Sequence, residues 1–108
     1  MIYIKINEAL YPATVRGKVS DPDWDGRETK SITLTMDYAV AAELFVNGLS
    51  WSIVEDGSNG TKEYDNSTFT LAGDLTDHRD GRVTAKMGRL TPLEEAYELM
   101  FGGTEDVE

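Results

Sequence analysis

The sequence contains no cysteine among its 108 residues. This absence excludes disulfide scaffolds, zinc sites built on thiolates and catalysis by a thiol, and it allows an intracellular origin. No run of about 18 apolar residues occurs, so the sequence predicts no membrane-spanning helix. The first 20 residues lack a basic start followed by a long apolar run, and we expect no secretory signal of that type.

Basic residues are few. Ten Lys and Arg stand against twenty Asp and Glu, which gives a formal net charge of −10 and an isoelectric point near 4.4. Phosphate backbones and anionic lipid surfaces repel such a chain, so we expect neither nucleic acid nor a membrane as its partner. The charge by itself is typical of a soluble protein.

The apolar residues predict an α+β domain. Residues 31–36 alternate as a half-buried strand, a helix begins after Asp37 and ends at Asn47-Gly48, and alternation resumes over residues 49–54. We expect two layers: an antiparallel-rich sheet of five to six strands, with two helices packed on one face. The residues expected to line that face are Ile4, Ile32, Leu34, Trp51, Ile53, Phe69, Leu71 and Val83.

Other segments complete this architecture. Residues 1–7 and 11–19 predict an N-terminal hairpin, in which Pro12 favours an edge position. Residues 67–72 and 83–87 predict a second hairpin through Asp80-Gly81, and the polar residues 55–66 between these units predict a mobile loop. Thr91, Pro92 and Glu94 stand in the order of a capping box before an amphipathic helix. The domain is expected to span residues 1–103, followed by a disordered acidic tail at 104–108.

Asp21, Asp23 and Asp25 alternate ahead of Gly26, as in the opening of an EF-hand calcium loop. Position twelve of such a loop is Ile32 instead of a bidentate Glu, and a strand follows instead of a helix. Two interpretations stay open: a weak calcium site, or an ordinary acidic surface loop. We predict no metal and no cofactor, with these three carboxylates as the weak candidates.

Trp24 lies in the same loop and also has two interpretations. It can anchor a partner or a sugar ring, or it can fold back over the edge of the core. His78 is the only histidine and is expected in a solvated turn, and no nucleophile or carboxylate pair indicates a catalytic site. The second face of the sheet is expected to be polar and hydroxyl-rich, through Thr33, Thr35, Ser50, Ser52, Thr68, Thr70 and Thr84.

Several segments together resemble a group of short, uncharacterised proteins encoded in prophages of Gram-positive gut bacteria, often near phage tail genes. They are residues 23–34, 64–67, 72–74, 77–81, 86–88 and 93–99, which begin with Asp23-Trp24-Asp25-Gly26 and end with Ala96-Tyr97-Glu98-Leu99. The resemblance implies a structural or assembly role, phage structural proteins as partners, and a location in the host cytoplasm or the virion. It carries no catalytic residues with it.

The sequence therefore favours a non-enzymatic, assembly-associated interaction protein, and leaves the oligomeric state open. The residues expected to bind a protein partner are Trp24, Asp23, Asp25 and Arg27, because an aromatic ringed by charges is typical of an interface anchor. The alternatives are a glycan-binding module that uses this loop, with or without calcium, and a small enzyme of unknown class.

Overall fold

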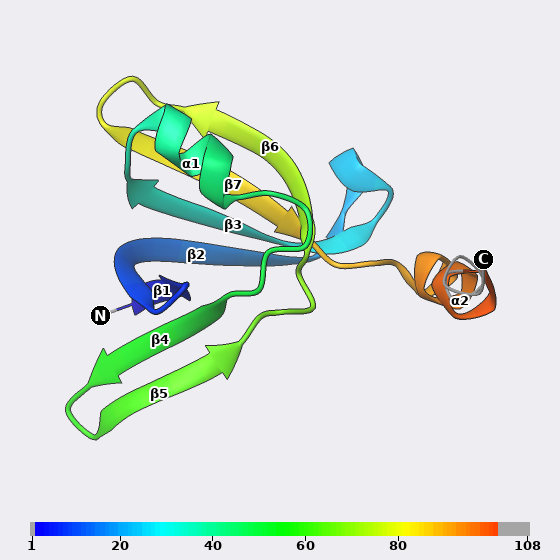
Figure 1. Ribbon diagram of the computed structural model, residues 1–108, viewed down its shortest axis with the longest axis horizontal. Coiled ribbons are helices and arrows are strands. Elements are labelled where there is room, and N and C mark those ends of the chain that lie inside the picture. Colours follow the sequence, from blue (N-terminus) through cyan, green and yellow to red (C-terminus); the bar gives the residue numbers. More distant parts are fainter. Residues whose placement is uncertain (1, 102–108) are drawn as a thin grey trace.

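The computed structural model describes residues 2–101, which form one antiparallel sheet and two α-helices (Figure 1). The strands are β1 (Ile2–Ile6), β2 (Ala9–Asp21), β3 (Arg27–Thr35), β4 (Ser52–Gly57), β5 (Gly60–Asp65), β6 (Leu71–Asp77) and β7 (Arg82–Gly88). The helices are a short 3-10 turn η1 (Pro22–Trp24), α1 (Tyr38–Leu44) and α2 (Pro92–Phe101). The strand order is β5-β4-β1-β2-β3-β7-β6. The α+β class and the antiparallel sheet are confirmed, whereas the predicted five to six strands were too few.

The additional strand, β5, lies in the segment predicted as a mobile loop. Residues 55–66 complete β4 and form β5, which pair from Ser52↔Asp65 to Gly57↔Gly60. Gly60 has a φ of 107°, a value that glycine adopts at little cost. Every residue of β5 is exposed, so neither face of this strand carries an apolar alternation. A prediction based on hydrophobic period therefore could not detect it.

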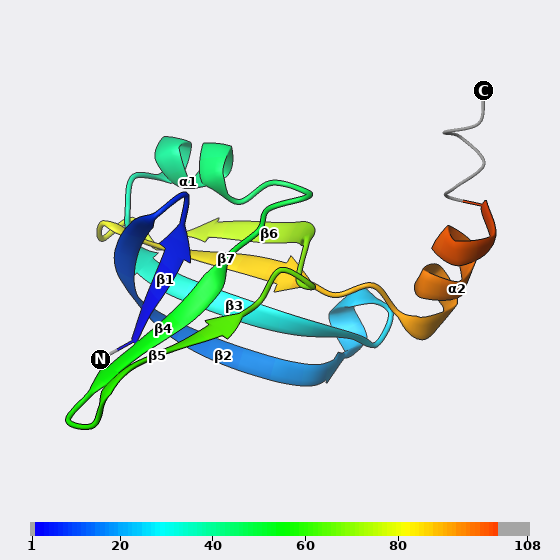
Figure 2. The same cartoon turned by 60° about the horizontal axis from the view of Figure 1, so that its bottom comes forward.

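Strand β2 belongs to two ladders. Residues 9–12 pair with β1, and residues 13–21 pair with β3. Pro12 is therefore the last residue of β2 that pairs with β1. Figure 2 shows β1, β4 and β5 crossing over β2 and β3. The N-terminal hairpin is confirmed, and Asn7 and Glu8 both take positive φ in its turn.

The core lies between the two halves of this folded sheet. Ile4 and Ile6 of β1 meet Ile32, Leu34, Val83, Ala85 and Met87 from β3 and β7, and Trp51 and Phe69 complete the cluster. The predicted core is largely confirmed, with Ile53 half-buried against the cluster. Leu71 is half-buried outside it, because a bulge between Ala72 and Leu75 shifts the register of β6 against β7.

The β6–β7 hairpin is also confirmed, although its first strand begins later than expected. Residues 67–70 precede β6 as a loop, in which Phe69 is nevertheless buried. Gly81 has a φ of 90° in the turn, as Asp80-Gly81 predicted.

The two helices have different surroundings. Helix α1 lies against β6 and β7 and turns Ala41 and Phe45 into the core. Helix α2 projects from the end of the sheet (Figures 1 and 2), so the prediction that both helices pack on one face is wrong for α2. Within residues 2–101, no helix is long and apolar enough to cross a membrane. The expected tail at 104–108 lies outside the described residues.

Candidate functional site

Asp21 fixes the loop that the sequence marked as a possible metal or partner site. Its side chain is fully buried and accepts hydrogen bonds from the Asp23 backbone N–H at 3.0 Å and from Thr29 Oγ1 at 3.3 Å. Lys86 of β7 donates to the same carboxylate at 2.8 Å. This ammonium holds the pKa of Asp21 below its usual value, and the carboxylate raises the pKa of Lys86. The charge of Asp21 is therefore balanced by the protein itself.

The three carboxylates considered as calcium ligands do not converge. Residues 22–24 form η1, which leaves Asp23 and Asp25 exposed while Asp21 points inward to Lys86. Among the described residues, no group of three or more His, Cys, Asp or Glu side chains is arranged to hold a metal ion. The alternating carboxylates serve as a helix cap and as surface charges.

Trp24 folds back over the sheet. A Cβ placed on Gly73 would lie 2.7 Å from Cζ3 of Trp24, and one on Gly88 would lie 2.8 Å from the same atom. The indole thus occupies the space that side chains at these two positions would fill. The guanidinium of Arg27 stacks on the ring at 4.7 Å from its centroid, a contact that stabilises both side chains. Trp24 is consequently half-buried, which agrees with the interpretation that it folds back over the edge of the core.

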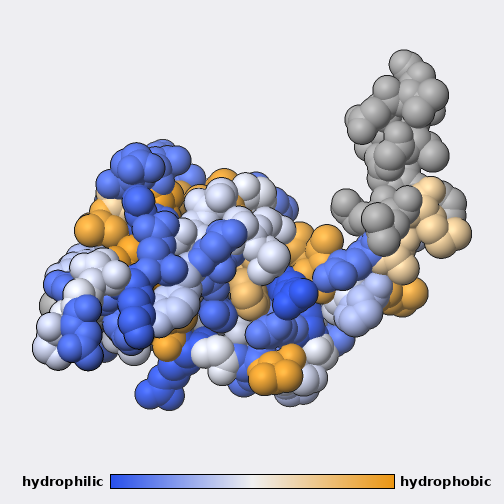
Figure 3. Space-filling view, turned by 90° about the horizontal axis from the view of Figure 1, so that it is seen from below, coloured by the Kyte–Doolittle hydropathy of each residue, from blue (hydrophilic) through white to orange (hydrophobic). Residues whose placement is uncertain are grey.

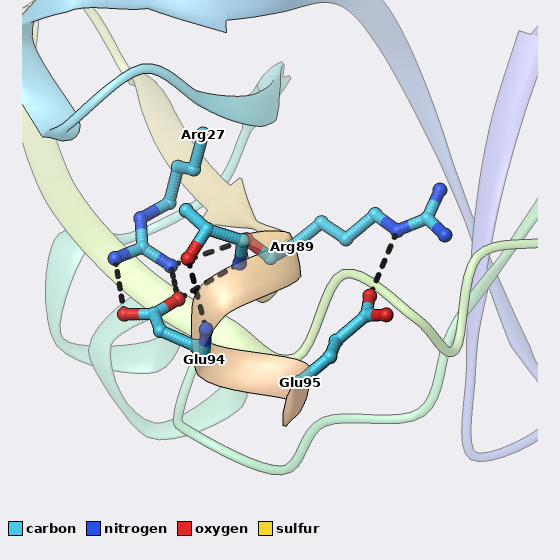
Figure 4. Close-up of polar contacts among 5 residues, drawn as sticks. Arg27, Arg89, Glu94 and Glu95 are labelled. Carbon is cyan, nitrogen blue, oxygen red and sulfur yellow. Dashed lines mark hydrogen bonds and ion pairs between the residues drawn. The ribbon is translucent and has the colours of Figure 1, made fainter. Parts of the chain in front are cut away.

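Arg27 connects this loop to α2 (Figure 4). Nη1 and Nη2 donate to the two carboxylate oxygens of Glu94 at 2.6 and 2.9 Å, and Nη1 also donates to the backbone carbonyl of Arg89 at 3.1 Å. Arg27 is only 5% exposed. A bidentate contact of this kind fixes the relative orientation of the two side chains as well as their distance. It therefore holds the first turn of α2 against the start of β3.

Glu94 has a second role as the acidic residue of the predicted capping box. The Thr91 backbone N–H donates to Glu94 at 2.9 Å, and the Glu94 N–H donates to Thr91 Oγ1 at 3.2 Å, which confirms the motif. Arg27 above all, and then the Thr91 N–H, lower the pKa of Glu94 from 4.5 to about 2. Arg89 adds longer contacts to Glu28 at 3.5 Å and to Glu95 at 3.8 Å.

We expect acid to release α2 from the body. Because the folded pKa of Glu94 is depressed, its contribution to stability is complete above pH 4.5 and is lost as the pH falls from 4.5 towards 2. Far-UV circular dichroism should show a loss of helix over this range in the parent protein. Glu94→Gln should have less helix at neutral pH and a smaller change on acidification. An equal change in both proteins would show that this pair does not hold the helix.

Helix α2 exposes three apolar residues along one stripe. Leu93 is 81% exposed and Met100 is 69% exposed, and Tyr97 on the same stripe is also largely exposed. Figure 3 shows apolar surface on this projecting helix, beside a body whose surface is largely hydrophilic. Isolated helices of fewer than about 12 residues are marginal in water. A ten-residue helix held by one end with its apolar stripe in solvent is typical of a docking element.

The residues predicted to bind a partner have separate positions. Asp23 and Asp25 are exposed and Trp24 is half-exposed, so their contact with a partner stays a prediction. Arg27 is buried, and its guanidinium is already engaged by Glu94, so it is not available as a surface contact. The sequence contained no signal for the Arg27–Glu94 pair, because 67 residues separate them and the capping box alone accounts for Glu94.

The His78 side chain lies beside the threonine hydroxyls of the polar face. Thr33 and Thr84 share a hydrogen bond of 2.8 Å across β3 and β7, and His78 Nε2 lies 2.7 Å from Thr84 Oγ1. A hydroxyl beside an imidazole needs a third group that orients the base and donors that stabilise charge. In the described part of the chain, no carboxylate forms a hydrogen bond with the His78 ring, and the histidine is exposed. Ser50, Thr68 and Thr70 lie in loops outside this face.

No protein-family model matches the chain, and neither the curated proteins nor the solved structures contain a significant match.

Proposed function

We propose that this chain is a non-enzymatic interaction protein that takes part in an assembly through helix α2. The observation that supports the proposal is the state of this helix, which Arg27 holds at its N-terminus and which exposes the apolar residues Leu93, Tyr97 and Met100. The buried Arg27 makes the attachment directional, because its two donors match the two oxygens of Glu94. A partner that covers Leu93 and Met100 would supply the burial that the helix lacks.

The type of assembly comes from the resemblance to prophage-encoded proteins. We propose that the chain is a structural or assembly-associated component of phage particles, acting in the host cytoplasm or within the virion. The exposed carboxylates of Asp23 and Asp25, with the outer part of Trp24, lie on the same loop that supports Arg27 and extend the proposed surface. We favour this proposal over glycan binding because Arg27 already stacks on the Trp24 ring.

Replacement of the apolar stripe tests the proposal. Leu93→Asp with Met100→Asp should reduce co-purification with particles from an induced lysogen by more than about tenfold, the size expected when interface anchors are lost. Thermal unfolding should change little, because both side chains are exposed in the isolated chain. Recovery of the parent chain in virions would favour a structural role, and recovery only in the lysate an accessory one.

The matched control is Val40→Asp, which places the same charge on a half-exposed apolar residue of α1. It should leave co-purification unchanged. The proposal is wrong if the α2 double variant is recovered with particles as well as the parent, or if Val40→Asp reduces recovery equally.

A further inference from the structure

Two segments of the sequence carry charges of opposite sign. Residues 9–20 contain Arg16 and Lys18 and no acidic residue, although the whole chain has a net charge of −10. Residues 90–108 contain no basic residue and six acidic ones: Glu94, Glu95, Glu98, Glu105, Asp106 and Glu108. Arg16 and Lys18 are exposed on β2, and within residues 2–101 neither forms an ion pair. The basic segment is thus available to an acidic one.

The same part of β2 has an open edge. Residues 13–21 pair with β3 on one side, while β1 reaches only residues 9–12 on the other. A Cβ on Gly17 would meet no atom within 4 Å, so nothing in the described chain covers this position. Val19 on this edge is 86% exposed, the largest exposed fraction among the large apolar residues. An open strand edge with an exposed valine is a surface that proteins usually cover.

The open edge continues into the base of α2. A groove of about 270 Å³ is lined by Val19 of β2, by Arg89, Leu90 and Pro92 at the base of α2, and also by Glu28 and Glu95. The groove therefore joins the exposed edge of β2 at Val19 to the base of α2. The chain thus carries both a projecting helix with apolar and acidic residues and a strand edge with basic and apolar residues.

We propose that a second copy of this chain covers α2, in a twofold dimer where α2 of each copy lies against residues 16–19 of the other. The inference rests on the proposed function of α2 as a docking helix and identifies the molecule that covers this helix. A twofold axis makes the interface self-complementary, because each copy provides one helix and one strand edge. Leu93 and Met100 then lie near Val19 and Leu90 of the partner. The acidic residues of α2 other than Glu94, which Arg27 of the same chain holds, face Arg16 and Lys18.

Charge also decides against the other self-associations that the surface offers. The outer side of α1 exposes Tyr38, Val40 and Val46, but its charged neighbours are Asp37 and Glu43, which would repel an acidic α2. Direct pairing of two β2 edges would bring Arg16 and Lys18 of the two copies together. Of these three contacts, the one between α2 and β2 joins opposite charges and covers both Val19 and Leu93.

Sedimentation equilibrium of the purified full-length chain tests the inference through exchanged charges. Variant A carries Arg16→Glu and Lys18→Glu, and variant B carries Glu95→Lys and Glu98→Lys. The parent should form a dimer that weakens with added salt. Each variant alone should dimerise at least about tenfold more weakly, because both of its contacts become like-charged. A mixture of A and B should form a heterodimer, since the acidic edge of A then meets the basic helix of B and the acidic helix of A meets the basic edge of B.

Three results would overturn the inference: a parent that stays monomeric, variants that dimerise as well as the parent, or a mixture of A and B without a heterodimer. Circular dichroism of each variant confirms that α2 is still helical. A monomeric parent would leave the proposed function untouched if Leu93→Asp with Met100→Asp still prevented co-purification with particles. Loss of the proposed function would appear instead as unchanged recovery of that double variant.

Discussion

Trp51→Ala should lower the free energy of unfolding by about 3–5 kcal/mol, the range for removal of a large aromatic side chain from a core. Trp51 is 2% exposed and packs within the cluster that joins the two halves of the sheet. Its indole N–H also donates to the carbonyl of Phe69 at 3.0 Å, so the variant leaves a buried acceptor without its donor. Natural domains have a total stability of only about 5–15 kcal/mol, so the loss is a large part of the whole.

Urea unfolding followed by circular dichroism measures this effect. With an m value of about 1–3 kcal/mol per molar urea, the midpoint should fall by about 1–5 M. Tyr64→Ala is the control, because that aromatic is half-exposed on β5 and should cost little. A Trp51→Ala midpoint close to that of the control would show that this tryptophan does not hold the two halves together.

Gly88→Ala should destabilise the protein by about 1–3 kcal/mol, as overpacking does in a tightly filled site. The new Cβ would lie 2.8 Å from Cζ3 of Trp24 and 2.8 Å from Cδ of Arg27. Neither neighbour can move freely, because Arg27 is fixed by Glu94 and Trp24 is stacked on Arg27. The variant should therefore displace the tryptophan and loosen α2 in the same step.

Acrylamide quenching of tryptophan fluorescence, together with thermal unfolding, detects both changes. Quenching should rise in Gly88→Ala as Trp24 becomes more exposed. Gly17→Ala provides the matched control, since a Cβ there meets no atom within 4 Å and the residue does not have a positive φ. If the two alanine variants unfold at the same temperature, Trp24 does not depend on the space above Gly88.

The sequence predicted those elements that have one buried and one exposed side. The alternation of Ile4 and Ile6, and of Ile32 and Leu34, located β1 and β3, and the turn residues located two hairpins. The same criterion missed β5, because a strand exposed on both faces has no apolar period. An apolar period appears only where one side of an element is buried against the rest of the chain. It therefore cannot predict a hairpin that extends past the core.

The candidate site was predictable only in part. The capping box placed the start of α2, and its apolar stripe was correct, but a stripe indicates only that a surface should be covered and not what covers it. Placement of the helix depends on Arg27, which the sequence marked as a surface contact. Gly73 and Gly88 were the residues that could have indicated a buried Trp24, yet a glycine within a strand has no single meaning before its neighbours are known.

The pairing of β3 with β7 also sets an order of events during synthesis. Thr33 and Thr84 are 51 residues apart in the sequence. One edge of β3 therefore stays unpaired until β7 has been synthesised and the segment between the two strands has folded back. Arg27 stays without its ion-pair partner for longer, because Glu94 follows it by 67 residues in the sequence. Arg27 can hold helix α2 in place only after the start of β3 has been fixed in the folded sheet. The apolar stripe therefore takes its fixed orientation only in molecules whose sheet has already folded.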